Sequence, residues 1–158
     1  MATLYTVDRP GRPGRLSTMP RPDGGSALAG ELAALAERGV TLVVSLLAEP
    51  ESDQLGLAEE AEAAERAGLA FRRLPTPDFG VPEPGPAQDL ANDLAARLAA
   101  GDHVVVHCRG GVGRSSLLAA LVLVAEGDAP DQAWARLGDA RGRPVPETDE
   151  QRAFVRPR

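Results

Sequence analysis

Residues 103–115 read His-Val-Val-Val-His-Cys-Arg-Gly-Gly-Val-Gly-Arg-Ser, and this pattern determines the architecture we expect. Its first half, centred on Val104, Val105 and Val106, has the β-branched composition of a buried strand. The glycine-rich turn that follows leads into residues 117–125, which are apolar on every side and predict a central, buried helix. A strand, a tight turn and a buried helix in succession are typical of α/β folds, which bind ligands beyond the carboxyl ends of their strands.

Strand-like and helix-like segments alternate along the rest of the chain. The β-rich runs predict four further strands, over residues 4–7, 15–19, 40–47 and 69–74. The spacing of apolar residues predicts helices over residues 28–38, 51–67, 90–100, 131–140 and 148–155. We therefore expect an α/β fold with a central, mainly parallel sheet flanked by helices, in a single domain over residues 1–158. Residues 1–25 supply its N-terminal strands and loop, and His103 is expected at an exposed strand entry.

The glycine-rich turn has the composition of an oxyanion site. Cys108 and Arg114 are separated by Arg109, Gly110, Gly111, Val112 and Gly113. A loop of this length can wrap its backbone N–H groups around a phosphate, and the following helix adds its positive N-terminal dipole. Arg114 brings a planar fork that matches two phosphate oxygens. The positive concavity favours the thiolate of Cys108 and places it for attack at phosphorus.

A second candidate for chemistry is Asp78, in a proline-rich loop expected over residues 75–86. Expulsion of an alkoxide or phenoxide from phosphorus needs a proton donor on the leaving oxygen, and a carboxyl on a closing loop can supply it. Asp78 can also be a simple turn residue. Its rivals Asp89 and Asp93 fall on a helical pattern, where carboxylates are usually solvated.

The segment over residues 107–115, His-Cys-x-x-Gly-x-Gly-Arg-Ser, resembles the signature of the protein-tyrosine-phosphatase superfamily. The additional glycine of this segment, Gly110, and the pattern Pro-x-x-Asp-x-x-x-Pro over residues 75–82 are similar to the branch that contains the cyclin-dependent-kinase-associated phosphatase and its bacterial relatives. This resemblance covers roughly residues 40–155. It implies a tyrosine or dual-specificity phosphatase that forms a phosphocysteine intermediate and uses no metal or cofactor.

The resemblance also implies roles for individual residues. Asp78 would protonate the leaving oxygen, the hydroxyl of Ser115 would stabilise the leaving thiolate, and Gln151, in a late loop, would orient the water that hydrolyses the intermediate. Structural interpretations stay open beside these roles. Cys108 can be a buried structural cysteine, Ser115 can satisfy N–H groups in the first helical turn, and His107 can simply order the loop.

Composition limits the possible partners. A net charge of −6 argues against general binding of nucleic acid or anionic membranes. The single cysteine excludes a disulfide within the chain and a multi-cysteine metal site, and it suits a reducing, cytoplasmic location. We expect a monomer whose partner is a phosphorylated protein or a small phosphate monoester.

Three alternatives to a protein phosphatase remain open. A phosphate-binding interaction module without turnover would lack the cysteine, the arginine or the acid, and this chain has all three. A phosphatase of the same mechanism can act on a non-protein monoester, such as a phosphoinositide or a nucleotide. Arsenate reductases and sulfurtransferases also use a looped cysteine, but thioredoxin-linked arsenate reduction usually needs further cysteines.

Overall fold

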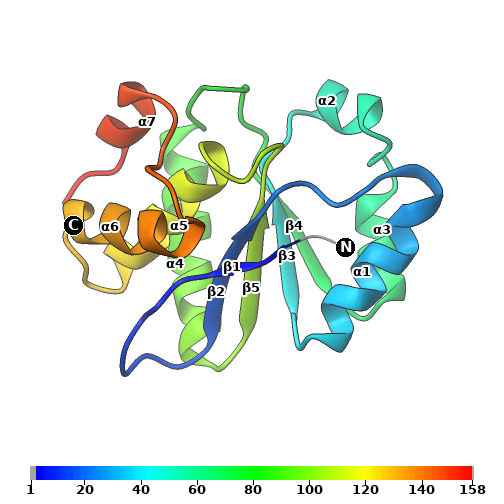
Figure 1. Ribbon diagram of the computed structural model, residues 1–158, viewed down its shortest axis with the longest axis horizontal. Coiled ribbons are helices and arrows are strands. Elements are labelled where there is room, and N and C mark those ends of the chain that lie inside the picture. Colours follow the sequence, from blue (N-terminus) through cyan, green and yellow to red (C-terminus); the bar gives the residue numbers. More distant parts are fainter. Residues whose placement is uncertain (1–2, 158) are drawn as a thin grey trace.

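The computed structural model describes residues 3–157, which are organised around a five-stranded sheet with the order β1-β2-β5-β3-β4 (Figure 1). The strands are β1 (Tyr5–Thr6), β2 (Arg15–Met19), β3 (Leu42–Ser45), β4 (Ala70–Arg73) and β5 (His103–His107). Only β1 runs antiparallel to its neighbour, and the other pairings are parallel. The prediction of an α/β fold with a mainly parallel sheet is confirmed.

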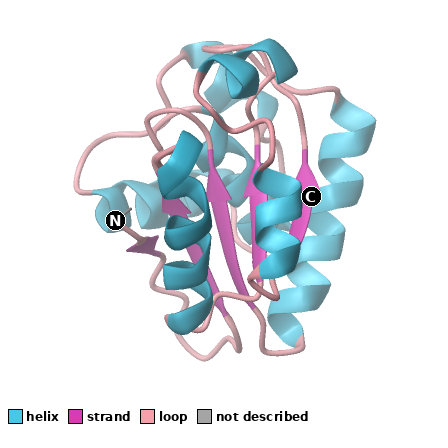
Figure 2. Cartoon of the chain, turned by 90° about the vertical axis from the view of Figure 1, so that its right-hand side faces the viewer, coloured by secondary structure: helices cyan, strands magenta, loops and turns pink. Residues whose placement is uncertain are grey.

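Helices cover both faces of this sheet (Figure 2). The α-helices are α1 (Leu28–Glu37), α2 (Glu49–Gln54), α3 (Glu60–Arg66), α4 (Pro84–Ala99), α5 (Arg114–Ala125), α6 (Pro130–Arg141) and α7 (Asp149–Phe154), and a short 3-10 helix, η1 (Gly25–Ala27), precedes α1. Alternate residues of β5 separate the two cores. Val104 and Val106 pack with α4, α5 and α6, whereas Val105 packs with α1 and α3.

Helix α5 lies at the centre of the larger core. Its residues 114–124 are all buried, and over residues 117–124 the uniformly apolar sequence predicts this burial. Such a helix has no polar face to turn toward water, so its position and rotation are fixed by contacts on every side. Because α5 begins directly after the glycine-rich turn, the buried helix holds that turn rigidly at one edge of the sheet.

Three expectations from the sequence are wrong. The single helix over residues 51–67 is interrupted, because the chain turns at Gly56 (φ +74°) so that Leu57 can be buried. The proline-rich loop ends at Glu83 rather than residue 86, since α4 begins at Pro84 and prolines are tolerated in a first helical turn, whose N–H groups lack intrahelical partners. His103 is buried, with 7% of its surface exposed.

The carboxyl ends of the four parallel strands meet at one edge of the sheet. The loop of Cys108 follows β5, the loop of Asp78 follows β4, and the chain enters α2 with Glu51 soon after β3. The topology therefore brings together groups that are 27 or more residues apart in the sequence. Among residues 3–157, none of the helices combines the length and the apolar character needed to cross a membrane.

Candidate active site

The loop over residues 108–113 is packed so tightly that it needs glycine at two positions. Gly111 adopts φ +75°, and a Cβ there would lie 2.8 Å from the backbone of Met19 and Pro20. A Cβ on Gly113 would lie 2.5 Å from a carboxylate oxygen of Glu147. Any larger side chain would push the loop away from the end of β2 or from the segment before α7.

Arg141 fixes the outward side of this loop. Its Nε donates to the carbonyl of Gly111 at 3.2 Å and its Nη2 donates to that of Gly110 at 3.4 Å. The guanidinium also stacks on the ring of Tyr5, 4.2 Å from the centroid. In a trans peptide the C=O and N–H point in opposite directions. Because the carbonyls of Gly110 and Gly111 face Arg141, the N–H groups of the residues that follow them point away from Arg141.

Cys108 lies at the base of the loop with 2% of its surface exposed. Its Sγ donates to Ser115 Oγ at 3.3 Å, and the same hydroxyl can donate to sulfur when the thiol is ionised. The preceding His107 is fully engaged: its Nδ1 lies 3.1 Å from the carbonyl oxygen of Cys108, and its Nε2 lies 2.6 Å from Glu60 Oε2. His107 therefore holds the start of the loop, and the buried Glu60 holds His107.

Arg114, only 2% exposed, is held by a carboxylate and a carbonyl. It makes a bidentate pair with Glu51, with N–O distances of 2.7 and 2.9 Å, and donates to the carbonyl of Thr76 at 2.9 Å. Burial alone would lower the pKa of Arg114, but the hydrogen bonds and charge of Glu51, with the charges of Cys108 and Asp78, raise it above its ordinary value. The hydrogen bonds from Arg114 likewise lower the pKa of Glu51.

The sequence-predicted acid, Asp78, reaches the same arginine. Its Oδ1 lies 3.2 Å from Arg114 Nη2, while 42% of its side chain remains exposed. The rival Asp93 lies on the surface instead, 3.5 Å from Arg72. The neighbouring Phe79 has φ +60°, a strained conformation for an aromatic residue. Among the described residues it is the large hydrophobic residue that is exposed to solvent, with 57% of its surface accessible. The acid loop thus carries a solvent-facing ring beside its carboxylate.

Gln151 lies behind both loops and is completely buried. It belongs to a capping box with Thr148 at the start of α7, and its Oε1 accepts from the backbone N–H of Glu147 at 3.0 Å. Its Nε2 donates to the carbonyl of Gly80 at 3.2 Å, which ties α7 to the acid loop. This contact positions the loop of Asp78, and the water-orienting role stays a prediction.

Arg109 is the exposed side chain of the loop, at 57%, with its guanidinium 4.0 Å from Glu51. Nothing in the sequence alone singles out Glu51, Glu60 or Arg141. Glu51 and Glu60 belong to an Ala- and Glu-rich stretch that looks like an ordinary solvated helix face. Within residues 3–157 no cluster of three or more His, Cys, Asp or Glu side chains is arranged to hold a metal ion.

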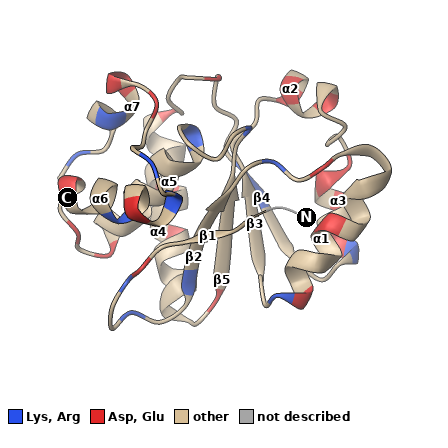
Figure 3. Cartoon of the chain, viewed as in Figure 1, with Lys and Arg blue, Asp and Glu red and all other residues tan. Residues whose placement is uncertain are grey.

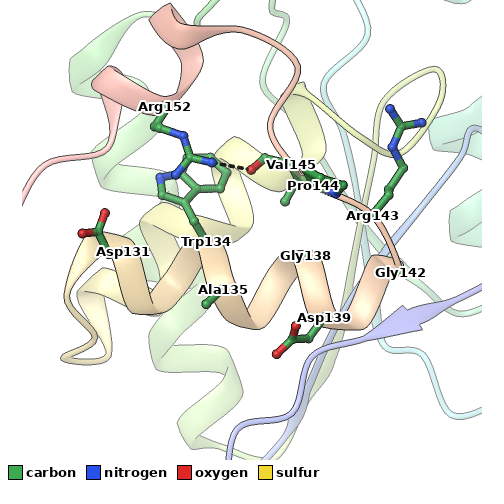
Figure 4. Close-up of a pocket in the computed structure, with 10 residues that line it drawn as sticks. All are labelled: Asp131, Trp134, Ala135, Gly138, Asp139, Gly142, Arg143, Pro144, Val145 and Arg152. Carbon is green, nitrogen blue, oxygen red and sulfur yellow. Dashed lines mark hydrogen bonds between the residues drawn. The ribbon is translucent and has the colours of Figure 1, made fainter.

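A cavity of about 650 Å³ lies away from this site, between α6 and the segment that leads to α7 (Figure 4). There Arg152 lies over the Trp134 ring, 5.4 Å from its centroid, and donates to the carbonyl of Val145 at 2.9 Å. None of residues 107–115 lines it. Cavity size therefore does not identify the site in this chain, and the convergence of Cys108, Arg114 and Asp78 does.

A glycine-rich loop after a parallel strand, with a cysteine at its base and an arginine at the start of the next helix, defines the class of dual-specificity and tyrosine phosphatases. A family model described as "Polymorphic toxin system, DSP-PTPase phosphatase" matches residues 17–128, and the chain belongs to this family. The predicted resemblance to the protein-tyrosine-phosphatase superfamily is confirmed.

Known proteins show the same likeness in sequence and fold. The cyclin-dependent kinase inhibitor 3 of Rattus norvegicus is 35% identical over 90 residues, which are 56% of this chain and 42% of that protein. The chain spans about two fifths of the length of this relative. A kinase associated phosphatase with its catalytic-site cysteine replaced by serine superposes with TM-score 0.87 at 20% identity, over 98% of this chain and 92% of that one. Tk-PTP in its active form gives 0.75 at 25% identity, over 96% and 93%.

Proposed function

We propose that the chain hydrolyses phosphate monoesters through a phosphocysteine intermediate on Cys108, as a tyrosine or dual-specificity phosphatase. The observation that carries this proposal is the convergence of three groups from two loops. The Sγ of Cys108 lies at the base of the glycine-rich loop, Arg114 is fixed at its end, and Asp78 lies 3.2 Å from Arg114. These are the nucleophile, the anion receptor and the acid that the reaction requires.

In the first step the thiolate of Cys108 attacks phosphorus in line with the leaving oxygen. The S–P bond forms, the P–O bond breaks, and Asp78 in its protonated form transfers its proton to the leaving oxygen. The backbone N–H groups of residues 109–114 and the guanidinium of Arg114 hold the equatorial oxygens, where negative charge spreads. Arg141 fixes the carbonyls of Gly110 and Gly111, and Glu51 with the carbonyl of Thr76 fixes Arg114.

Asp78 and the substrate compete for the same arginine. The Nη1 of Arg114 donates to Glu51 and to the carbonyl of Thr76. Its Nη2 donates to the other oxygen of Glu51 and lies 3.2 Å from Asp78 Oδ1. A bidentate phosphate therefore needs the Nη2 position that Asp78 now occupies. Binding of a dianion displaces the carboxylate of Asp78 from Arg114, which leaves Asp78 able to turn toward the leaving oxygen.

In the second step a water molecule attacks the phosphocysteine and Asp78 takes up the proton of that water. The S–P bond breaks and the thiolate leaves, stabilised by a hydrogen bond from Ser115, whose hydroxyl lies 3.3 Å from the sulfur. Gln151 orients the water in this proposal. This role is supported by the hydrogen bond from Gln151 to the carbonyl of Gly80, which places Gln151 beside the loop that carries Asp78.

Phe79 favours an aromatic leaving group. Its ring is 57% exposed next to the proposed acid, and an exposed ring held in a strained backbone conformation suggests a contact that function requires. We therefore favour phosphotyrosine or another aryl phosphate over an alkyl phosphate. We further propose that residues 1–158 act as one monomeric domain, in the reducing cytoplasm that keeps Cys108 a thiol.

The test is hydrolysis of p-nitrophenyl phosphate in the presence of a metal chelator, by the wild type and by Cys108→Ser. We expect activity in the wild type only, and phosphate attached to Cys108 in protein denatured during turnover. Phosphate found only on a histidine or an aspartate would refute the scheme. An inactive, fully reduced wild type that still binds phosphate would instead support a binding module without turnover.

A further inference from the structure

Four successive carbonyl groups at the start of the glycine-rich loop are each held by a donor from outside the loop. His107 Nδ1 lies 3.1 Å from the carbonyl oxygen of Cys108, and the backbone N–H of Arg21 donates to the carbonyl of Arg109 at 3.1 Å. The next two carbonyls both accept from a single side chain, that of Arg141. The loop is therefore supported from three separate segments of the chain.

The N–H groups that follow these carbonyls are left available. In a trans peptide C=O and N–H point in opposite directions, so each N–H of residues 109–112 points away from the donor that holds the carbonyl before it. Among residues 3–157, no acceptor receives a hydrogen bond from these N–H groups. Successive free N–H groups in a turn form an anion-binding concavity. The donors outside the loop therefore prepare it to bind a phosphoryl group.

Arg141 has a special place among these donors because it holds two neighbouring carbonyls. It is the last residue of α6, and its Nε and Nη2, on one edge of the guanidinium, donate to Gly111 at 3.2 Å and to Gly110 at 3.4 Å. A planar guanidinium keeps its donors at a fixed spacing, which a lysine ammonium does not. Arg141 thus fixes the orientation of two successive peptide groups relative to each other.

These two peptide groups need support because they belong to glycines. Gly111 has φ +75°, and a Cβ there would lie 2.8 Å from the backbone of Met19 and Pro20, so a less flexible residue does not fit. Glycine has a wide choice of backbone conformations. Rotation of either peptide group would turn a carbonyl oxygen toward a bound anion in place of an N–H, and that oxygen would repel the anion.

The guanidinium of Arg141 is in turn held by β1. It lies over the ring of Tyr5, 4.2 Å from the centroid, in the geometry of a cation–π contact. Strand β1 pairs with β2 and lies beside α6, along which acidic and basic residues alternate (Figure 3). The ring covers a face of the guanidinium, whereas the carbonyls of the loop use its edge. The two contacts therefore do not compete.

We propose that Arg141 is a positioning residue of the phosphatase site and that Tyr5 supports it through the stacked ring. This inference rests on the proposed function, because it concerns the same loop, and it extends the site to α6 and β1. Arg141 acts through the peptide groups of Gly110 and Gly111, and Tyr5 acts through Arg141. A basic residue in the last turn of a helix also stabilises that helix, but such a role alone would leave phosphate binding unchanged.

The experiment measures phosphate binding separately from turnover. The amide resonances of residues 109–112 are followed during a titration with inorganic phosphate, and kcat/KM is measured with p-nitrophenyl phosphate, at a temperature where each variant is fully folded. Loss of one fixed donor to a developing anion costs about 10²–10³ in rate. Because Arg141 acts indirectly, we expect Arg141→Lys and Arg141→Gln to lower both the phosphate affinity and kcat/KM by about tenfold. Arg143→Gln removes the same charge from an exposed position nearby and should change neither.

Variants of Tyr5 test the second contact. Tyr5→Phe keeps the ring and should behave as the wild type. Tyr5→Leu should weaken phosphate binding about two- to fivefold, as expected for the loss of an exposed cation–π contact. In the Arg141→Gln background Tyr5→Leu should cause no further loss, because Tyr5 acts only through Arg141.

The outcomes separate this proposal from the proposed function. Wild-type phosphate affinity in folded Arg141→Gln, or an equal loss from Tyr5→Leu with and without Arg141, would overturn the proposal. A wild type whose loop amides do not respond to phosphate would overturn it as well. A wild type that binds phosphate in a manner that depends on Arg141, yet hydrolyses no aryl phosphate, would support the positioning role and contradict the proposed function.

Discussion

Glu51→Gln tests whether the arginine of the loop works because it is held in place. The wild-type carboxylate forms two hydrogen bonds with Arg114, at 2.7 and 2.9 Å, and only 12% of the Glu51 side chain and 2% of the Arg114 side chain are exposed. Removal of one partner from a buried ion pair costs about 3–5 kcal/mol. Because glutamine keeps one acceptor and Glu51 is partly solvated, we expect a loss of unfolding free energy near the lower end, about 3 kcal/mol.

Activity should fall with the loss of this support. Loss of one fixed donor to a developing anion costs about 10²–10³ in kcat. Glu51→Gln leaves Arg114 present but free to turn toward Asp78, so we expect a decrease of about ten- to a hundredfold in kcat/KM, which is roughly 1.4–2.7 kcal/mol. The assay is aryl phosphate hydrolysis at a temperature where the variant is fully folded. Glu49→Gln, on the exposed side of the same helix, is the matched control.

The pH dependence of stability gives a second measure of the same pair. The pKa of Glu51 is lower in the folded state than its ordinary value of 4.5. The ionised carboxylate therefore stabilises the fold fully above pH 4.5, and this stabilisation is lost as the pH falls through the lowered pKa of the folded state. The difference in unfolding free energy between wild type and Glu51→Gln should therefore shrink in acid. Wild-type activity in Glu51→Gln, together with a clear loss of stability, would refute the idea that Glu51 positions Arg114 for catalysis.

The other predictions concern the core, the contact between Arg12 and Asp128, the acid loop and the start of α7. Leu94→Ala, at a fully buried position of α4, should lower the unfolding free energy by about 2–5 kcal/mol in a denaturant titration. Burial would raise the pKa of Asp128, but hydrogen bonds from Arg12 lower it; Asp128→Asn should therefore cost about 1–3 kcal/mol at neutral pH, and a cost that persists in acid would contradict this assignment. Phe79→Gly should lower kcat/KM for aryl phosphates about two- to tenfold, with alkyl phosphates unaffected; an equal loss for both would argue against a ring contact. Gln151→Ala should remove about 1 kcal/mol of capping stability and increase the burst of phosphoenzyme, and an unchanged burst would leave Gln151 a purely structural residue.

The sequence predicts the parts of the site that are local in the chain. The strand, the loop and the buried helix around Cys108 are contiguous, so composition and spacing are sufficient to define them. The acid loop was placed near Cys108 because loops that follow parallel strands share one edge of the sheet. The structure brings Asp78 to Arg114 by this arrangement.

Other parts depend on contacts between distant segments, which a single sequence does not reveal. Glu51 is recognised as a partner of Arg114 only when α2 is seen beside the loop, 63 residues away in the chain. The break at Gly56 follows from the burial of Leu57 and from a backbone contact between Gly25 and Gly56. His103 was expected to be exposed because the sequence does not show that the end of α1 lies beside the start of β5.

The two carboxylates around Arg114 affect which anions can bind to this arginine. In the free protein the guanidinium already faces Glu51 and Asp78, so two negative side chains surround one positive group. A sulfate ester or a phosphodiester brings one negative charge and competes poorly with a tethered aspartate, whereas a phosphate monoester brings two. We therefore expect the exchange of Asp78 for substrate at Arg114 to favour doubly charged phosphate monoesters over singly charged esters of similar shape.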